Sequence, residues 1–227
     1  MTDTTITVQG EHSAWFPAEQ ATAHASVHAD GPKRDAVFAR AVGASDALRT
    51  FIQSIHDAEA GPVTHWSADS VRVWSERPWN NEGKQLAPVF HAAMDFTARF
   101  RDFEVLARWV ETAAGFDAVT VGSIEWDITD ETRAAVTTDV RTKAVQDAVA
   151  KATVYAKALG VGAISPLALA DVGMLGDPSG GGGGPQPVFA RGAMMKSQAY
   201  DSSAAQLALK PEDILIQAMV DARFSAR

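Results

Sequence analysis

The segment TDETRAAVTTDVRTKAVQDAVAKATVYAKALG, residues 129–160, predicts one long helix with an inward face built almost wholly from alanine and valine. Its small and apolar side chains recur at spacings of three and four residues, which places them on one stripe of the helix. The stripe comprises Ala144, Val145, Ala148, Val149, Ala152, Tyr155, Ala156 and Leu159. Because alanine is small, we expect the helix to lie flat against a sheet or another helix.

Both ends of this helix are specified by the sequence. Thr129 is a suitable N-cap, and Asp130 and Glu131 place negative charge in the first turn, where the helix dipole favours it. Lys157 lies in the last turn, and Gly160 can adopt the left-handed conformation that ends a helix. The helix is therefore expected to begin and end close to these residues.

The composition indicates an ordinary acidic globular protein. The chain has 227 residues, 46% of them hydrophobic and 21% charged, which suits one sizeable domain or two small ones. The formal net charge of -8, with no run of Lys and Arg, argues against nucleic-acid binding. The chain has no cysteine, which excludes disulfides, thiolate metal sites and cysteine nucleophiles.

Location is predicted from two absences in the sequence. The opening MTDTTITVQG, residues 1–10, enters a strand-like pattern without the basic and apolar regions of an export signal. No stretch approaches the ~18 apolar residues that a membrane-spanning helix requires. We therefore expect a cytoplasmic protein with no membrane span.

The rest of the chain predicts an α+β fold, a mostly antiparallel sheet packed with one long and two shorter helices. Residues 20–29 alternate alanine and valine with polar side chains, so we expect one buried and one solvated face. Residues 89–101 alternate in the same way and pair most simply with residues 63–76 as an antiparallel hairpin. The remaining predicted elements are strands at 6–16, 118–127, 164–172 and 211–227, and helices at 33–58 and 103–114.

A glycine-rich tract, GDPSGGGGGPQP at residues 176–187, interrupts this pattern near the C-terminus. Five consecutive glycines framed by prolines cannot pack a core, so we expect a flexible loop or insertion at about 176–188. A phosphate-binding P-loop is disfavoured because the Lys-Ser/Thr pair that should follow it is missing. The strand at 211–227 must then return to the sheet, which makes the sheet depend on the C-terminus.

Four segments in chain order resemble the SIMPL-domain family. The opening ITVQGEHSAWFPAEQATAHASVHADG (6–31) resembles the family's first strands, joined through Pro17-Ala18-Glu19. The segment 89–136 is similar to its order of strand, Arg-Asp turn, short helix, glycine, strand and long helix. The Ala-Lys-Ala-Leu-Gly-Val end of the helix (156–161) and PEDILIQAMVDARF (211–224) complete a resemblance that covers nearly the whole chain.

This resemblance implies a single SIMPL-like domain over residues 1–227, with a fold of mixed sheet and helices and oligomer formation in some members. Family members are linked to stress responses, immunogenicity and, in animals, signalling partners, and are often periplasmic or surface-associated. The family has no established catalytic residues to carry over to this chain. The chain departs from the family pattern in its missing export signal and in the glycine tract.

The histidines do not form a recognisable metal site. His24 and His28 project from the same strand face, but residues four apart on a strand are separated by about 13 Å, too far to bind one metal ion. His65 and His91 lie in the predicted hairpin and can approach each other across it. A zinc site there would still need a third ligand that the sequence does not supply.

The acidic residues give no clear acid-base pair either. Asp95 with Arg99, and Glu125 with Asp127, are most simply charged residues on solvated strand faces. No nucleophile elbow, zinc-binding HExxH helix or dinucleotide-binding glycine motif occurs in a supporting context. We therefore assign no catalytic, cofactor-binding or metal-binding residues and expect no cofactor.

Tryptophans provide the remaining candidate site. Trp66, Trp74 and Trp79 crowd the hairpin and its loop, where an aromatic cluster can bind a partner or a neighbouring subunit. The alternative is that they seal the sheet edge or the core. The favoured function is a non-enzymatic protein that acts through self-assembly or partner binding. The competing hypothesis is a small-molecule binding protein or an unrecognised enzyme, with a pocket between sheet and helices.

Overall fold

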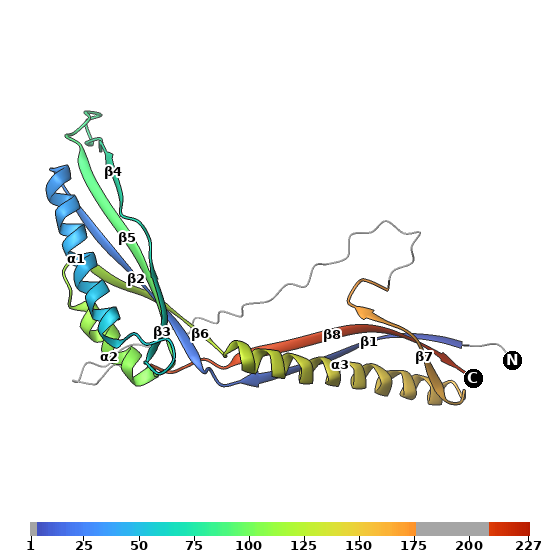
Figure 1. Ribbon diagram of the computed structural model, residues 1–227. Helices are drawn as coiled ribbons and strands as arrows, with labels where there is room; N and C mark the ends of the chain where they lie inside the picture. Colours follow the sequence, from blue (N-terminus) through green and yellow to red (C-terminus); the bar gives the residue numbers. More distant parts are fainter. Residues whose placement is uncertain (1–3, 176–208) are drawn as a thin grey trace, which may run out of the picture. The chain divides into compact units, whose positions relative to one another are not determined.

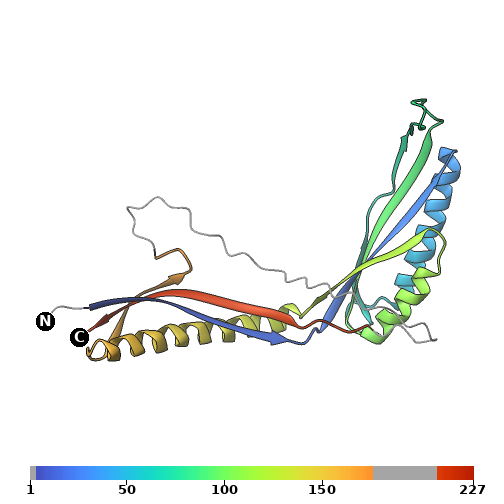
Figure 2. The same ribbon diagram turned by 180° about the vertical axis from the view of Figure 1, so that it is seen from behind.

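The computed structural model describes residues 4–175 and 209–227, which form two compact units (Figures 1 and 2). The terminal unit contains residues 4–16, 129–175 and 213–227. The central unit contains residues 17–128 and 209–212. Helices and antiparallel strands occur in both, which confirms the predicted α+β class. That the whole chain folds as one domain stays a prediction, and the glycine tract lies outside the described residues.

The terminal unit is a three-stranded antiparallel sheet with one long helix on it (Figure 1). Its elements are β1 (Thr4–Phe16), α3 (Asp130–Ala158), β7 (Ile164–Asp171) and β8 (Ile214–Ala226). The strand order is β1-β8-β7, so the last strand of the chain lies in the middle of the sheet. This position agrees with the prediction that the C-terminal strand completes a sheet.

Helix α3 packs on β1 and β8 through a row of small side chains. Val140, Ala144, Ala148, Ala152 and Ala156 are its buried residues, and all lie four residues apart. A Cβ atom placed on Gly10 of β1 would lie 2.7 Å from the Cβ of Ala148. The helix therefore approaches the strand so closely that neither position has room for a larger side chain.

The predicted ends of α3 are confirmed, but its buried face is narrower than predicted. The Oγ1 of Thr129 accepts a hydrogen bond from the backbone N–H of Thr132, and Gly160 has φ +70. Val149, Tyr155 and Leu159, which the periodicity placed on the inward stripe, are 41%, 51% and 62% exposed. The buried residues recur every four positions rather than every ~3.6, so the buried line winds slowly around the helix. By the last turns of α3, Tyr155 and Leu159 lie to the side of that line.

The central unit is a second antiparallel sheet, with α1 and α2 on one face (Figure 1). Its strands run in the order β3-β5-β2-β6, and β4 also pairs with β5. The elements are β2 (Gln20–Gly31), α1 (Arg34–Ile55), β3 (Val63–Ala68), β4 (Arg72–Glu76), β5 (Val89–Phe100), α2 (Phe103–Ala114) and β6 (Val119–Asp127).

The alternating patterns of β2 and β5 predict their faces correctly. Most helix-facing residues of both strands are buried, and most of their neighbours on the other face are partly or fully exposed, with the buried Ala93 as an exception. The core beneath the helices includes Phe96, Phe100 and Trp109, and the rings of Phe100 and Trp109 lie 5.3 Å apart. One prediction needs correction, because residues 63–76 form two strands rather than one. Between β3 and β4, the backbone N–H of Asp69 donates to the carbonyl oxygen of Asp95.

We predict that Ala148→Leu lowers the free energy of unfolding by roughly 1–3 kcal/mol, because the larger side chain overpacks the contact with Gly10. Ala150→Leu is the matched control, since Ala150 is exposed on the same helix. Urea denaturation followed by circular dichroism measures both variants. Equal stability of the two would contradict the close packing of α3 on β1.

We also predict that a chain ending at Lys210 loses the fold of the terminal unit, because the deletion removes the central strand β8. Without β8, neither β1 nor β7 retains its strand partner. Hydrogen exchange followed by mass spectrometry should show unprotected amides in β1 and α3. Protection equal to that of the full chain would refute the dependence on β8.

Candidate functional site

One end of the central unit carries an aromatic pair on β4 and β5, of which the tryptophan is exposed. Trp74 lies opposite His91 in the sheet, and their rings stack with centroids 5.3 Å apart and an interplanar angle of 21°. The Oε1 atom of Glu76 is 3.6 Å from the Nε2 atom of His91. Trp74 remains 46% exposed, so an indole held by a stacked imidazole is available at the surface.

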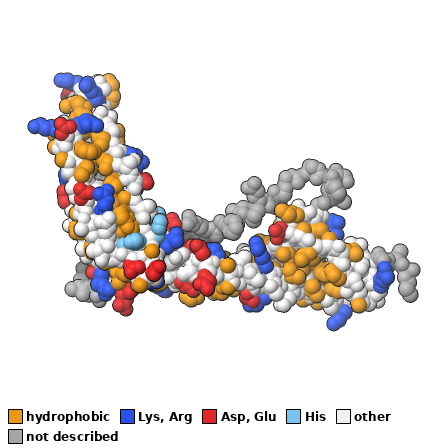
Figure 3. Space-filling model, viewed as in Figure 1, with side chains coloured by type: hydrophobic (Ala, Val, Ile, Leu, Met, Phe, Trp, Pro, Cys, Tyr) orange, Lys and Arg blue, Asp and Glu red, His pale blue; other side chains and the backbone are white. Residues whose placement is uncertain are grey.

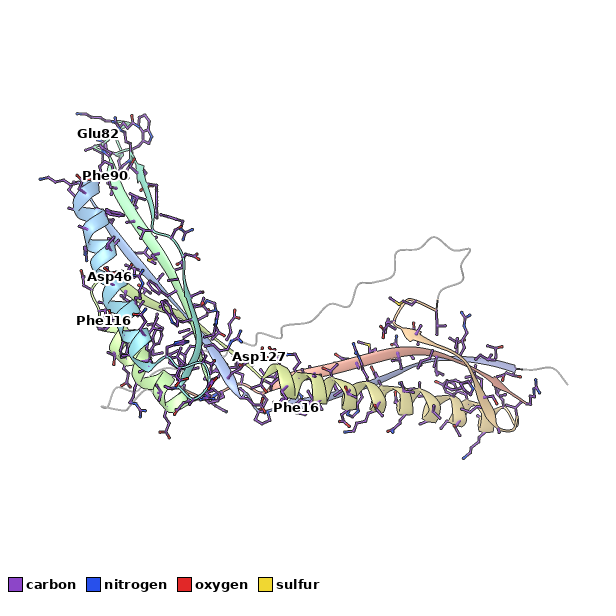
Figure 4. The ribbon with its side chains drawn as sticks, viewed as in Figure 1. Phe16, Asp46, Glu82, Phe90, Phe116 and Asp127 are labelled. Atoms are coloured by element: carbon purple, nitrogen blue, oxygen red, sulfur yellow. The ribbon has the colours of Figure 1, made fainter. Side chains whose placement is uncertain are left out.

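The loop between β4 and β5 holds a second tryptophan at this end. The Oδ1 atom of Asn80 accepts hydrogen bonds from the backbone N–H groups of Glu82 and Lys84. Trp79 pairs with Gln85 in an isolated antiparallel bridge and is 67% exposed. Figure 4 shows Glu82 in this loop, near Phe90 of β5. The hydrogen bonds to the Asn80 side chain thus keep the loop folded while the indole of Trp79 faces solvent.

Trp66 does not belong to this surface, which corrects the predicted cluster of three tryptophans. It lies opposite Ala98 on the helix-facing side of the sheet and packs, partly buried, against the core. A register shift between Val63 and His65 changes the phase of β3 and turns Trp66 inward. Trp74 and Trp79 remain as the exposed pair.

The open face of the central sheet carries four of the six histidines of the chain. They are His24, His28, His65 and His91. His24 and His28 share this face, as expected from the alternation in β2. The predicted approach of His65 to His91 is wrong. His65 lies opposite residue 99 of β5, roughly 26 Å along the strand from His91.

Charged side chains on this face pair with one another. Asp95 accepts a hydrogen bond from Arg72 at 2.6 Å. The Nε2 atom of His24 lies 3.8 Å from the Oε1 atom of Glu125. Across residues 4–175 and 209–227, no group of three or more His, Asp or Glu side chains is placed to hold a metal ion.

Two grooves open to solvent occur among the described residues. One, of ≈ 440 Å³, lies beside α1 and Phe116, whose position next to α1 is visible in Figure 4. Arg40 and Asp117 line it and form a two-pronged ion pair with both distances 2.8 Å. The hydrogen bond from Arg40 lowers the pKa of Asp117, so this carboxylate is held ionised as a structural partner.

The other groove, of ≈ 390 Å³, lies in the terminal unit between the first half of β1 and the end of α3. Its walls are Thr4, Thr5, Ile6, Thr7, Tyr155, Ala158 and Leu159. None of these side chains carries a charge. Tyr155 and Leu159 are among the exposed apolar residues that the sequence placed in the core.

Next to this groove, two side chains of α3 bind the free edge of β1. The Oδ2 atom of Asp147 accepts a hydrogen bond from the backbone N–H of Glu11 at 2.9 Å, and Lys151 donates to the carbonyl oxygen of Gln9 at 3.0 Å. Asp147 and Lys151 also pair with each other at 2.8 Å. The four-residue spacing of Asp147 and Lys151 can be seen in the sequence, but their binding to β1 cannot be predicted from it.

The opposite edge of the sheet, β7, is apolar and irregular. Figure 3 shows hydrophobic side chains gathered over β7 and the adjoining part of α3. Leu167 and Leu169 of β7 are 58% and 57% exposed. Pro166 lacks a backbone N–H, and the register with β8 shifts between Pro166 and Ala168. Proline and a bulge are the usual means of preventing a further strand from pairing at such an edge.

Comparison with known proteins gives one family. The family model described as "SIMPL: Protein of unknown function (DUF541)" matches residues 6–224, most of the chain. No curated protein matches the sequence. Among the described residues, no helix has the length and apolar character needed to cross a membrane.

The ion pair at the edge of β1 predicts a pH-dependent stability. The hydrogen bonds from Lys151 and from the N–H of Glu11 lower the pKa of Asp147. A lowered carboxyl pKa stabilises the fold above the ordinary pKa, and this stabilisation is lost as the pH falls through the lowered value. Asp147→Asn should therefore flatten the decrease in melting temperature between about pH 5 and pH 2.

Asp139→Asn is the matched control, because Asp139 forms an i,i+4 pair with Lys143 at 2.7 Å and, within the described residues, no hydrogen bond to a strand. We expect its pH profile to follow that of the unmodified protein. Identical profiles for the two variants would show that the contact of Asp147 with β1 adds no pH-dependent stability.

Proposed function

Since the chain belongs to the SIMPL family, we propose that it is a non-enzymatic protein that acts through self-assembly or through binding a protein partner. The observation that carries this proposal is the pair of exposed tryptophans, Trp74 and Trp79, at one end of the central unit. Because family members are linked to stress responses, we extend the proposal to a role in such a response.

Trp74 and Trp79 have the properties of residues that dominate binding at protein interfaces. A tryptophan buries a large apolar area on binding, and its ring N–H still reaches a hydrogen-bond acceptor. Stacking on His91 restricts the Trp74 ring, and the hydrogen bonds of Asn80 restrict the loop that carries Trp79. Less conformational entropy is therefore lost on binding than with mobile side chains.

The competing function is a small-molecule binding protein or an enzyme that uses the groove beside α1 and Phe116. The paired Arg40 and Asp117 would be its polar groups. Binding sites for small molecules are usually enclosed and contain polar groups that converge on the ligand. Arg40 and Asp117 bind each other instead, and the groove is open, so the aromatic surface supports the better proposal.

We predict that Trp79→Ala shifts the protein toward smaller assemblies, or weakens binding of a partner, while the melting temperature changes little. The reason is that the Trp79 side chain is mostly in solvent and contributes little to the fold. Light scattering coupled to size-exclusion chromatography measures the assemblies.

Trp66→Ala is the control, because Trp66 packs against the core and its truncation should lower the melting temperature. An unchanged assembly in Trp79→Ala, together with unchanged binding to proteins that the unmodified chain captures, would contradict the proposal.

A further inference from the structure

The free edge of β1 contains a short open window. In an antiparallel strand, the N–H and C=O groups of one residue point to the same side, and the side alternates along the strand. The backbone groups of Gln9 and Glu11 bind side chains of α3, so the odd-numbered residues of β1 point to the edge away from β8. Thr5 and Thr7 therefore present their N–H and C=O groups at this edge, where no hydrogen bond is recorded for them within the described residues.

The window is bounded on one side by Lys151, which closes it at Gln9. Thr5 and Thr7 supply its open backbone groups, and Ile6 lies midway between them. The uncharged groove of Tyr155, Ala158 and Leu159 lies along these same residues. Leu159 and Tyr155 are more than half exposed there, although both have large apolar side chains.

We propose that this window pairs with the same window of a second copy, forming a two-fold antiparallel β1–β1 contact centred on Ile6. This inference rests on the proposed self-assembly and adds to it a second surface, in the terminal unit. Thr5 of one copy then lies opposite Thr7 of the other, and the two residues exchange both of their edge hydrogen bonds. The three-stranded sheets of two terminal units join into a sheet of six strands.

Pairing with a second copy covers more of the apolar groove than pairing with an unrelated peptide would. A two-fold axis at Ile6 places the C-terminal turns of both α3 helices on the same face of the joined sheet. Tyr155 and Leu159 of each copy then cover the inward-facing side chains of the other copy's strand. The groove residues carry no charge, so two copies of a chain with net charge -8 meet there without like-charge repulsion.

The same features explain why the contact stays small. The hydrogen bonds of Asp147 and Lys151 with β1 prevent the new ladder from extending past Val8. A ladder of about five residues with one apolar groove buries less than the ~1,600 Å² of a standard stable interface. The dimer is therefore weak and dependent on protein concentration.

Cysteine cross-linking tests the register directly, because the chain has no cysteine of its own. In the proposed contact, Thr5 and Thr7 of opposite copies have Cα atoms about 5.5 Å apart, within the range for a disulfide. An equimolar mixture of Thr5→Cys and Thr7→Cys should form a disulfide-linked dimer under mild oxidation. Each variant alone should cross-link less, because equal-numbered residues are diagonal neighbours about 7–8 Å apart.

A mixture of Thr5→Cys and Ser13→Cys is the matched control, since Ser13 lies on the same strand and points to the same edge but outside the window. Cross-linking that is equal in all mixtures would overturn the proposed register. Cross-linking of Thr5→Cys only to a foreign protein would overturn the choice of a second copy as the partner.

Proline substitution provides the second test. Thr7→Pro removes an N–H that faces the free edge, a position where strands tolerate proline, and should at least halve the dimer fraction seen by sedimentation equilibrium. Ser13→Pro should leave this fraction unchanged. An unmodified protein that stays monomeric and binds no partner would overturn the proposed function itself. Assembly that Thr7→Pro does not alter would overturn only the β1 contact.

Discussion

The close contact between α3 and β1 is the constraint on which the terminal unit depends. A glycine on the strand and alanines on the helix allow the two backbones to approach, and a Cβ atom on Gly10 would come within 2.7 Å of Ala148. This approach brings the side chains of Asp147 and Lys151 within hydrogen-bond distance of the strand's free edge. Packing and edge protection are thus two consequences of the same small residues.

Much of the fold can be predicted from local sequence, because caps and alternation are local. The N-cap at Thr129, the positive φ of Gly160 and the buried faces of β2 and β5 all follow from short patterns. The distribution of strands over two sheets cannot be read in this way, since it depends on pairing between distant segments. The path of the buried line around α3 likewise depends on the sheet beneath the helix, since its buried residues recur every four positions.

The candidate site was predicted only in part, for an equally physical reason. Trp74 and Trp79 are exposed, as an interaction surface requires, but the register shift in β3 moves Trp66 to the helix-facing side. A bulge inserts one residue, so every later side chain on the strand points to the opposite face of the sheet. No residue type in β3 indicates that a bulge occurs there. The predicted approach of His65 to His91 is wrong because β3 and β4 pair with different segments of β5.

The two edges of the three-stranded sheet are protected by different means, and the difference bears on assembly. At β7, Pro166 and a register shift interrupt the edge within the strand itself. At β1 the protection comes from α3, whose Asp147 and Lys151 reach only Gln9 and Glu11. Protection supplied by a neighbouring element ends where that element's polar side chains end, and beyond Lys151 the helix presents Tyr155 and Leu159 instead. The free edge of β1 is thus blocked over its middle and lies beside apolar side chains along its open part. Pairing with another strand is limited to that short stretch, which favours a discrete contact over indefinite strand addition.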